Sequence, residues 1–375
     1  MACEFSRRRL LCQGANAALA AGIPLTGALA DTNTNPKPID EYRRSGMLYR
    51  RLGGTDLFVS ALSFGSHINS AHRVKVKHGS TLDKRGQDRR DRHIARAMDY
   101  GVNMVDTYEN AGQWQPLAKL VSSRRDRVLV SMCRQFPEFV GANIDDAARL
   151  FGHVDLYRIY VGDGDHVDDR ILEDWDAMRR AKQAGKVRAI GISTHSERMM
   201  VSALDELEGL DYIMFPYNFI HARADYIDVL PKAIRQQVGL IAIKPLAAGS
   251  IVKLDPKAPP GSTPENTQVQ LYRGNNRPLL PAIVEKLTES LKRLPDESLC
   301  QAALRFVYSQ SFITSAMPGM FQAHEVDDNY AALQRQLELS QVELDVLDAA
   351  RMLCSARGPG WLPAHYRWLD QHWRV

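Results

Sequence analysis

The stretch NMVDTYENAGQWQPLAKLV, residues 103–121, places a short apolar run before a polar turn and an amphipathic segment. The apolar run predicts a buried strand, and the amphipathic segment predicts a helix. The same unit recurs along the chain, with candidate strands at 59–66, 103–108, 127–133, 154–161, 187–194, 212–218, 239–245 and 313–319. Strand–helix units in this succession indicate an α/β fold, a parallel (β/α)8 TIM barrel.

An open, doubly wound sheet is the rival architecture. It would require a glycine-rich turn directly after its first strand, to approach the phosphates of a nucleotide. The sequence there is SFGSHINSAH, residues 63–72, which contains no such glycine pattern. The barrel is therefore the preferred prediction.

Composition limits the classes of partner. The chain has 375 residues, of which 45% are hydrophobic and 25% charged, and its formal net charge is +4. Its basic residues are scattered rather than aligned, which argues against nucleic acid as a partner. After the first 30 residues, no stretch is long and apolar enough to span a membrane, so we expect no membrane contact once that segment is removed.

The first 30 residues differ in kind from the rest. Arg7, Arg8 and Arg9 precede an alanine-rich, mildly apolar run that ends in Ala28-Leu29-Ala30. This order predicts a signal peptide read by the twin-arginine export machinery, and hence an exported, periplasmic protein. A disordered alanine-rich tail is the alternative. Three widely spaced cysteines would remain after cleavage, which is not the pattern of a disulfide framework or a cysteine metal site.

The predicted domain boundaries follow from these patterns. Residues 1–30 are the signal peptide, 31–46 a linker, 47–340 the barrel, and 341–375 a C-terminal helix with a tryptophan-rich tail. Two long charged or Pro/Gly-rich segments, 67–90 and 247–277, follow strands one and seven. We expect them to be loops at the C-terminal face of the barrel, where sites are built.

Seven motifs follow one another in the order and spacing typical of the aldo-keto reductases, which the chain resembles over about residues 47–335. They are MLYRRLGGTDLFVSALSFGS, GVNMVDTYENAG, HVDLYRIYVGDGD, KQAGKVRAIGISTHS, FPYNF, IKPLAAGS and AMPGMFQAHEVDDN. The exported bacterial members are the most similar branch. The resemblance implies a nicotinamide cofactor, NADP or NAD, hydride transfer to a carbonyl or sugar-like substrate, and a tetrad of Asp, Tyr, Lys and His.

One tetrad position of four matches the family pattern. Asp106 stands in the expected VDT context, but Ala111 replaces the acidic Tyr. Cys133 stands where the Lys is expected, and Tyr160 where the His is expected. The catalytic site of the family is therefore altered in this chain.

A relocated acid is one way to restore the chemistry, because the carbonyl oxygen needs a donor as it accepts hydride. Tyr108 and Tyr160 end neighbouring strands, with Arg134 at a strand end between them. We expect Asp106 and Arg134 to form a salt bridge at the barrel mouth, beside one of these tyrosines. The alternative is that the tyrosines only fill the mouth. If Asp106 and Arg134 lie on opposite sides of the barrel wall, a degenerate barrel is favoured.

The resemblance also assigns the cofactor-binding positions. They are Ser193 and Thr194 after strand five, Lys244, Pro245 and Leu246 after strand seven, and Gly319 and Asn329 around strand eight. Met214 replaces a Gln on strand six, and Phe321 replaces the basic residue that grips the adenosine phosphate. Backbone N–H groups at the start of the next helix could still hold a pyrophosphate. NAD is therefore as plausible as NADP.

No metal site is predicted. The acidic run GDGDHVDD, residues 162–169, has the wrong spacing for a calcium loop, and we expect it to cap a helix N-terminus. Lys244 is the other residue with open alternatives, as a pocket-lining cation, a phosphate ligand or a Schiff-base nucleophile. Two functions remain: an oxidoreductase with an altered acid site, and a catalytically degenerate barrel that binds a ligand or partner.

Overall fold

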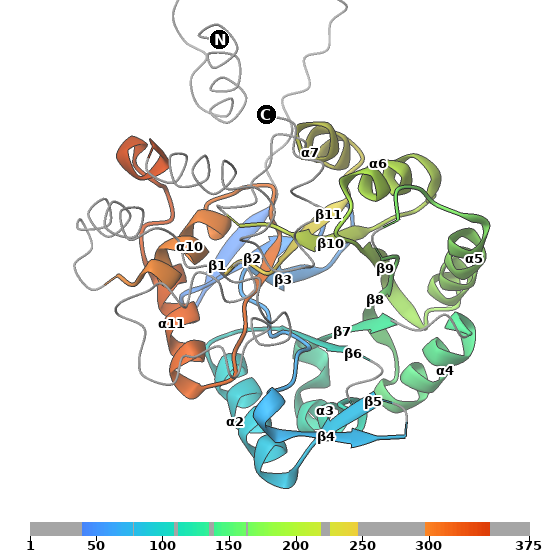
Figure 1. The fold of residues 1–375 in the computed structure, drawn as a ribbon, viewed down its shortest axis with the longest axis horizontal. Coiled ribbons are helices and arrows are strands. Elements are labelled where there is room, and N and C mark those ends of the chain that lie inside the picture. Colours follow the sequence, from blue (N-terminus) through green and yellow to red (C-terminus); the bar gives the residue numbers. More distant parts are fainter. Residues whose placement is uncertain are drawn as a thin grey trace, which may run out of the picture. The chain divides into compact units, whose positions relative to one another are not determined.

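A parallel sheet of seven strands forms the centre of the protein (Figure 1). The computed structural model describes residues 40–77, 79–108, 112–134, 139–162, 164–218, 226–246 and 297–345. The strands run in the order β12-β11-β10-β9-β8-β7-β6. Their bounds are β6 Met104–Tyr108, β7 Leu129–Arg134, β8 Val154–Tyr160, β9 Val187–Ser193, β10 Tyr212–Pro216, β11 Gly239–Ile243 and β12 Ser315–Met317.

Residues 61–64 close this sheet into a barrel. Leu62 forms a parallel bridge to Ala316 in β12, and Phe64 forms one to Val105 in β6. The backbone N–H of Asp106 donates to the carbonyl of Phe64 at 2.8 Å. The segment takes the eighth strand position between β12 and β6, so the predicted (β/α)8 barrel is confirmed.

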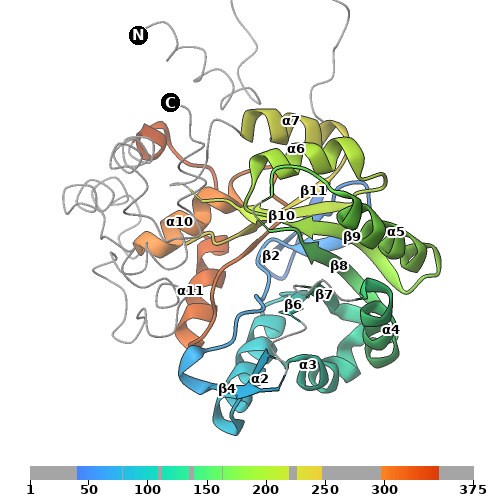
Figure 2. The same ribbon diagram turned by 45° about the vertical axis from the view of Figure 1, so that its right-hand side comes forward.

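Helices surround the barrel and follow the strands in alternation (Figure 2). They are α2 Lys84–Asp99, α3 Trp114–Val121, α4 Val140–Phe151, α5 Asp169–Gln183, α6 Glu197–Glu206, α7 Tyr226–Arg235, α10 Leu299–Tyr308 and α11 Ala323–Gln334, with a short 3-10 helix at Ser122–Arg127. The predicted cap is present at α5, where the Asp168 side chain accepts from the N–H of Ile171 at 2.8 Å. Among the described residues, none of the helices is apolar over a length that would cross a membrane.

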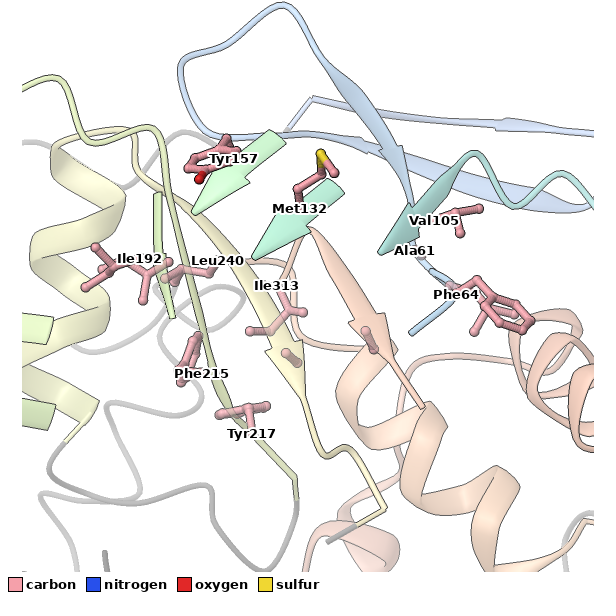
Figure 3. Packing of buried hydrophobic residues seen from close by; sticks show 14 of the residues in the cluster. Ala61, Phe64, Val105, Met132, Tyr157, Ile192, Phe215, Tyr217, Leu240 and Ile313 are labelled. Atoms are coloured by element: carbon pink, nitrogen blue, oxygen red, sulfur yellow. The ribbon is translucent and has the colours of Figure 1, made fainter. Parts of the chain in front are cut away.

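The strands separate two apolar layers, because successive side chains point to opposite faces. One face packs against the helices, and Figure 3 shows part of this layer, with Val105, Met132 and Phe215. The other face fills the barrel, where Met104, Leu156, Met214 and Ile241 cluster with Leu52, Leu57 and Val59 of the N-terminal hairpin. The N-terminal hairpin supplies those residues and plugs the N-terminal end of the barrel, which leaves the C-terminal end for a site.

The hairpin consists of β1 Glu41–Arg44, β2 Met47–Arg51 and β3 Phe58–Ser60. Gly53 sits at φ +53 where β2 and β3 turn, and a Cβ there would lie 2.2 Å from the carbonyl oxygen of Gln237. The close approach fixes the hairpin against the barrel end and requires glycine. Because β1 pairs with β2, the predicted linker 31–46 is corrected at its end: residues 41–44 form a strand.

The predicted loop 67–90 is also corrected. It contains a 3-10 turn at Ser70–His72, a two-stranded ribbon of β4 Arg73–Val76 and β5 Gly79–Leu82, and the first turns of α2. Asp83 begins the helix, since its side chain accepts from the N–H of Gly86 at 2.7 Å. The polar composition of residues 67–90 gave no sign of this hairpin. The residues of β4 are exposed on both faces of the strand.

Other predicted segments lie outside the described residues. These are the signal peptide, the segment 247–277, and the tail from residue 346 onward. Residues 341–345 are helical, as predicted for the start of the C-terminal region. Glu343 there accepts a 2.5 Å hydrogen bond from the buried Arg305 of α10, which ties this turn to the barrel.

Candidate active site

A buried ion pair forms the floor of the barrel's C-terminal mouth. Arg158 of β8 donates from Nη1 to Oδ1 of Asp106 at 2.5 Å and from Nη2 to Oδ2 at 2.8 Å. The Ser131 hydroxyl donates to the same Oδ1 at 2.6 Å. Asp106 is 0% exposed and Arg158 1% exposed. The two-point geometry is the arrangement that compensates best for taking both charges out of water.

Electrostatics follow from this geometry. Burial lowers the pKa of Arg158, but the Asp106 carboxylate and nearby Cys133 more than reverse this and hold that pKa well above its ordinary value. Tyr212 of β10 lies beside the same guanidinium, and burial raises the pKa of its hydroxyl well above the usual range. A Cβ on Gly191 would lie 2.7 Å from the Tyr212 ring, so glycine there makes the room. In the floor of the mouth, the charge of Arg158 thus offsets that of Asp106 in a fixed arrangement.

The predicted Asp106–Arg134 salt bridge is wrong. Arg134 donates from Nη2 to Asp174 of α5, on the helix side of the barrel wall. Ser131 and Cys133 of β7 point inward with Asp106, so the next residue, Arg134, must point outward. Arg134 therefore has no part in the site.

Sequence reasoning missed Arg158. It lies two residues before Tyr160 on the same strand and so shares its inward face. A charged residue inside an otherwise apolar strand was the available signal, because such a residue is almost never buried without a partner.

Tyr108 lies at the mouth but is an unsuitable acid. Its ring packs edge-on against His67, with centroids 5.3 Å apart, and joins the apolar contact of Ile68 and Leu82. Burial raises the pKa of its hydroxyl strongly, with a further contribution from Cys133. The proton is therefore held too tightly for transfer at neutral pH.

Tyr160 lies in a different setting. It ends β8 and is 36% exposed, and its ring stands edge-on to His195 with centroids 5.8 Å apart. Nζ of Lys244 lies 2.7 Å from Nε2 of His195. Three strand ends, of β8, β9 and β11, thus bring a phenol, an imidazole and an amine into one chain of contacts.

The backbone at Lys244 is strained. Its φ is +54°, in the left-handed region that non-glycine residues rarely adopt. The Asn218 side chain donates to the carbonyl of Lys244 at 3.0 Å and holds this conformation. Such positions cost on the order of 1 kcal/mol or more and concentrate at functional sites.

His67 lies on the other side of the mouth. Burial lowers the pKa of its imidazole to about 3, helped by the positive charges of Lys244, Arg73 and Arg90. Arg90 of α2 holds this loop, with hydrogen bonds of 3.0 Å to the carbonyls of His67 and Gly65. His67 is therefore a neutral imidazole at physiological pH.

The cofactor-binding positions around strands five and seven have distinct settings. Ser193 faces the barrel interior beside Tyr160, and Pro245 and Leu246 follow Lys244 at the mouth. Thr194 instead donates to the carbonyl of Gly162 and accepts from the N–H of Ser196, both at 3.0 Å. Its hydroxyl is engaged in holding the turn before α6. Of these predicted cofactor-binding residues, Ser193 and Lys244 thus have their side chains at the mouth.

The loop after β12 is braced by contacts within the chain. Asn329 donates to the carbonyl of Gly319 at 3.1 Å and braces the loop. The N–H groups of Phe321 and Gln322 both donate to Glu325, at 2.5 and 3.0 Å. The Glu325 carboxylate thus accepts from two N–H groups directly before α11, and Phe321 brings no charge to the loop.

Two further observations complete the site. Cys133 and Tyr160 occupy the predicted positions at the ends of β7 and β8, whereas Ala111 lies outside the described residues. Within the residues that the structure describes, no cluster of His, Cys, Asp or Glu is arranged to hold a metal ion.

The chain was compared with known protein families and structures. The sequence model of the Aldo/keto reductase family matches residues 83–351. The chain is 26% identical over 345 residues to L-glyceraldehyde 3-phosphate reductase of Escherichia coli O157:H7, covering 84% of this chain and 96% of the relative. It is 23% identical over 314 residues to L-galactose dehydrogenase of Arabidopsis thaliana, covering 79% and 90%.

A solved structure agrees at the level of the fold. An aldo-keto reductase of Bacillus halodurans, in its holo form, superposes with a TM-score of 0.60 at 21% identity, covering 80% of this chain and 95% of that one. The barrel agrees with the family match, and that match, over more than half of the sequence, shows that this chain belongs to the aldo/keto reductase family.

Proposed function

We propose that the protein is an oxidoreductase that uses NADP or NAD to reduce a carbonyl or sugar-like substrate through an altered acid site. The site consists of Tyr160, His195 and Lys244, in place of the family's Tyr, Lys and His. The observation that carries the proposal is the 2.7 Å contact between Lys244 Nζ and His195 Nε2, beside the exposed Tyr160. The two relatives named above act on sugars or sugar phosphates, which supports the substrate class.

The chemistry of these residues follows from charge. Hydride is what a nicotinamide supplies when bound. The substrate's carbonyl oxygen then gains negative charge, and Lys244 and Tyr160 are the donors that stabilise and protonate it. When Tyr160 gives its proton to the alkoxide, His195, in contact with both residues, passes a proton from Lys244 Nζ to the phenolate that remains.

The Asp106–Arg158 pair has a supporting role. In the family a lysine offsets the aspartate, and Cys133 cannot do so here. Arg158 offsets it instead, so the carboxylate does not repel the developing alkoxide. His67, on the other side of the mouth, is neutral and does not contribute a charge to the site.

The test compares Lys244→Met with Lys186→Met, which removes an exposed lysine paired with Asp145. We expect the wild type and Lys186→Met to oxidise NADPH or NADH in the presence of an aldose or hydroxyaldehyde. Lys244→Met should lose most of this activity. Equal activity of the two variants would contradict the assignment.

A degenerate barrel that binds a ligand or partner is the second candidate. It is favoured by the outward orientation of Arg134, because the predicted Asp106–Arg134 pair is then missing from the mouth, and by Cys133 at the lysine position. The discriminating measurement is cofactor binding. A protein of this second kind would show no thermal stabilisation by NADPH or NADH, because only ligands of the folded state raise its stability.

We further propose export through the twin-arginine route, supported by the arginines and the Ala28-Leu29-Ala30 end of residues 1–30. Changing Arg7 and Arg8 to Lys should leave the protein in the cytoplasm with this segment uncleaved. Fractionation and mass spectrometry of the N-terminus measure both. Normal export of the double variant would refute the proposal.

A further inference from the structure

A hollow rich in basic side chains lies outside the barrel mouth, between α2 and the loop after β12. It is open on one side, and the space of about 270 Å³ that it borders includes solvent outside that opening. Its lining residues are Asn69, His72, Leu82, Gly86, Arg89, Arg90, His93, Met320 and Phe321. Two arginines and two histidines are among them, and no carboxylate is.

Arg89 is held in place by neutral partners. Asp83 lies 3.1 Å from Nδ1 of His72, so that nitrogen carries the proton, and Nε2 accepts from Arg89 Nη1 at 3.4 Å. Arg89 Nη2 donates to the side-chain oxygen of Gln322. Neither acceptor carries a charge, so these contacts orient the guanidinium without cancelling its charge.

Arg90 is held in the same way. Its Nη atoms donate to the carbonyls of His67 and Gly65, while its Nε is buried without a hydrogen-bond partner. Arg90 is only 8% exposed. A buried donor without a partner costs free energy that a bound acceptor would recover.

The arginines of α2 also act on His93 of the same helix. Burial and the charges of Arg89, Arg92, Arg90 and Arg96 lower the pKa of His93 to about 4. Among the described side chains, Arg89 and Arg90 contact the His72 ring, the Gln322 amide and backbone carbonyls rather than carboxylates. The hollow is thus a preorganised cationic pocket with apolar walls from Leu82, Met320 and Phe321.

We propose that this hollow binds a phosphate group, either as free phosphate or as the monoester of a larger ligand, with Arg89 and Arg90 supplying the charge. Guanidinium groups match the tetrahedral oxygens of phosphate through paired N–H donors. The pocket borders the loop whose own N–H donors are occupied by Glu325. The proposal does not rest on the redox function.

The experiment is a titration of the full protein with inorganic phosphate, followed by calorimetry and thermal shift, at ionic strength matched with chloride. We expect saturable binding that Arg89→Gln weakens at least tenfold. Arg92→Gln is the control, because Arg92 is exposed on the same helix and does not line the hollow. Circular dichroism confirms that both variants are folded.

Two nucleotides identify the source of the phosphate. If 2′,5′-ADP competes with phosphate, and 5′-AMP does so less, the pocket takes the monoester of a larger ligand. If inorganic phosphate alone binds, it is a free-anion site. Phosphate effects no larger than those of chloride, or equal affinities in the two arginine variants, would overturn the proposal.

Discussion

Two arginines on neighbouring strands, Arg134 of β7 and Arg158 of β8, have opposite roles. Arg158 is sealed inside the barrel against Asp106, and Arg134 crosses to the outside and meets Asp174 of α5. In the parallel register, Arg158 lies beside Cys133, one residue before Arg134. This offset of one position decides which of the two arginine side chains points into the barrel, because side chains alternate between the faces of a strand.

The inner pair should be the more sensitive of the two. Arg158→Met would leave the Asp106 carboxylate buried and unpaired, which costs about 3–5 kcal/mol of unfolding free energy. Urea denaturation followed by circular dichroism measures the loss. The double variant Asp106→Asn with Arg158→Met should recover much of it. A double variant as unstable as the single one would show that packing, rather than charge, explains the loss.

Lys244 is expected to separate activity from stability. Lys244→Gly should lower kcat about 100-fold, the usual effect of removing one donor to a developing oxyanion. The same change should maintain or raise thermal stability, because glycine adopts φ +54° without strain. Steady-state kinetics and thermal denaturation report the two effects. If Lys244→Gly lowers both kcat and thermal stability, the role of Lys244 is structural.

The outer pair should contribute less. In Arg134→Met, Asp174 remains near solvent with 19% of its side chain exposed and can be hydrated. The change also removes two buried Arg134 nitrogens, Nε and Nη1, that have no partner. We expect a cost below about 2 kcal/mol and unchanged kcat. A loss equal to that of Arg158→Met would refute the inside–outside distinction.

Acid should act through two imidazoles, the half-buried His67 and the buried His93. The pKa of His67 is lowered to about 3 and that of His93 to about 4, so both are neutral in the folded protein at pH 7. The unfolded chain takes up these protons near pH 6.5, so their contribution to stability is complete above that pH. It is lost progressively as the pH falls from 6.5 toward 4. His93→Gln should flatten the slope of unfolding free energy between pH 6.5 and 4.5, and an unchanged slope would contradict this.

The fold could be predicted from the sequence, because it depends on local patterns repeated many times. The strand VDLYRIY and the unit 103–121 were identified by their apolar runs, and β8, β6 and α3 lie there. Errors fell where composition was ambiguous, as in the polar hairpin of β4 and β5, which carries few apolar residues to mark it.

The site was only partly predictable. Asp106 and Tyr160 were located by motif, and strand alternation applied to β7 and β8 would have exchanged Arg134 for Arg158. The contact of His195 with Lys244 joins loops 49 residues apart and depends on φ +54° at Lys244. No sequence pattern contains that geometry. The occupation of the α11 N-terminus by Glu325 likewise depends on where one side chain folds back.

The most direct test of the central claim is a fluorescence titration of the wild type and Lys244→Met with NADPH and NADH. An oxidoreductase with its site at Tyr160, His195 and Lys244 should give saturable enhancement of nicotinamide fluorescence with at least one cofactor. Lys244→Met should bind that cofactor more weakly, because it lacks a cation at the mouth. Absence of binding with both cofactors in the wild type would contradict the redox function and leave the degenerate barrel.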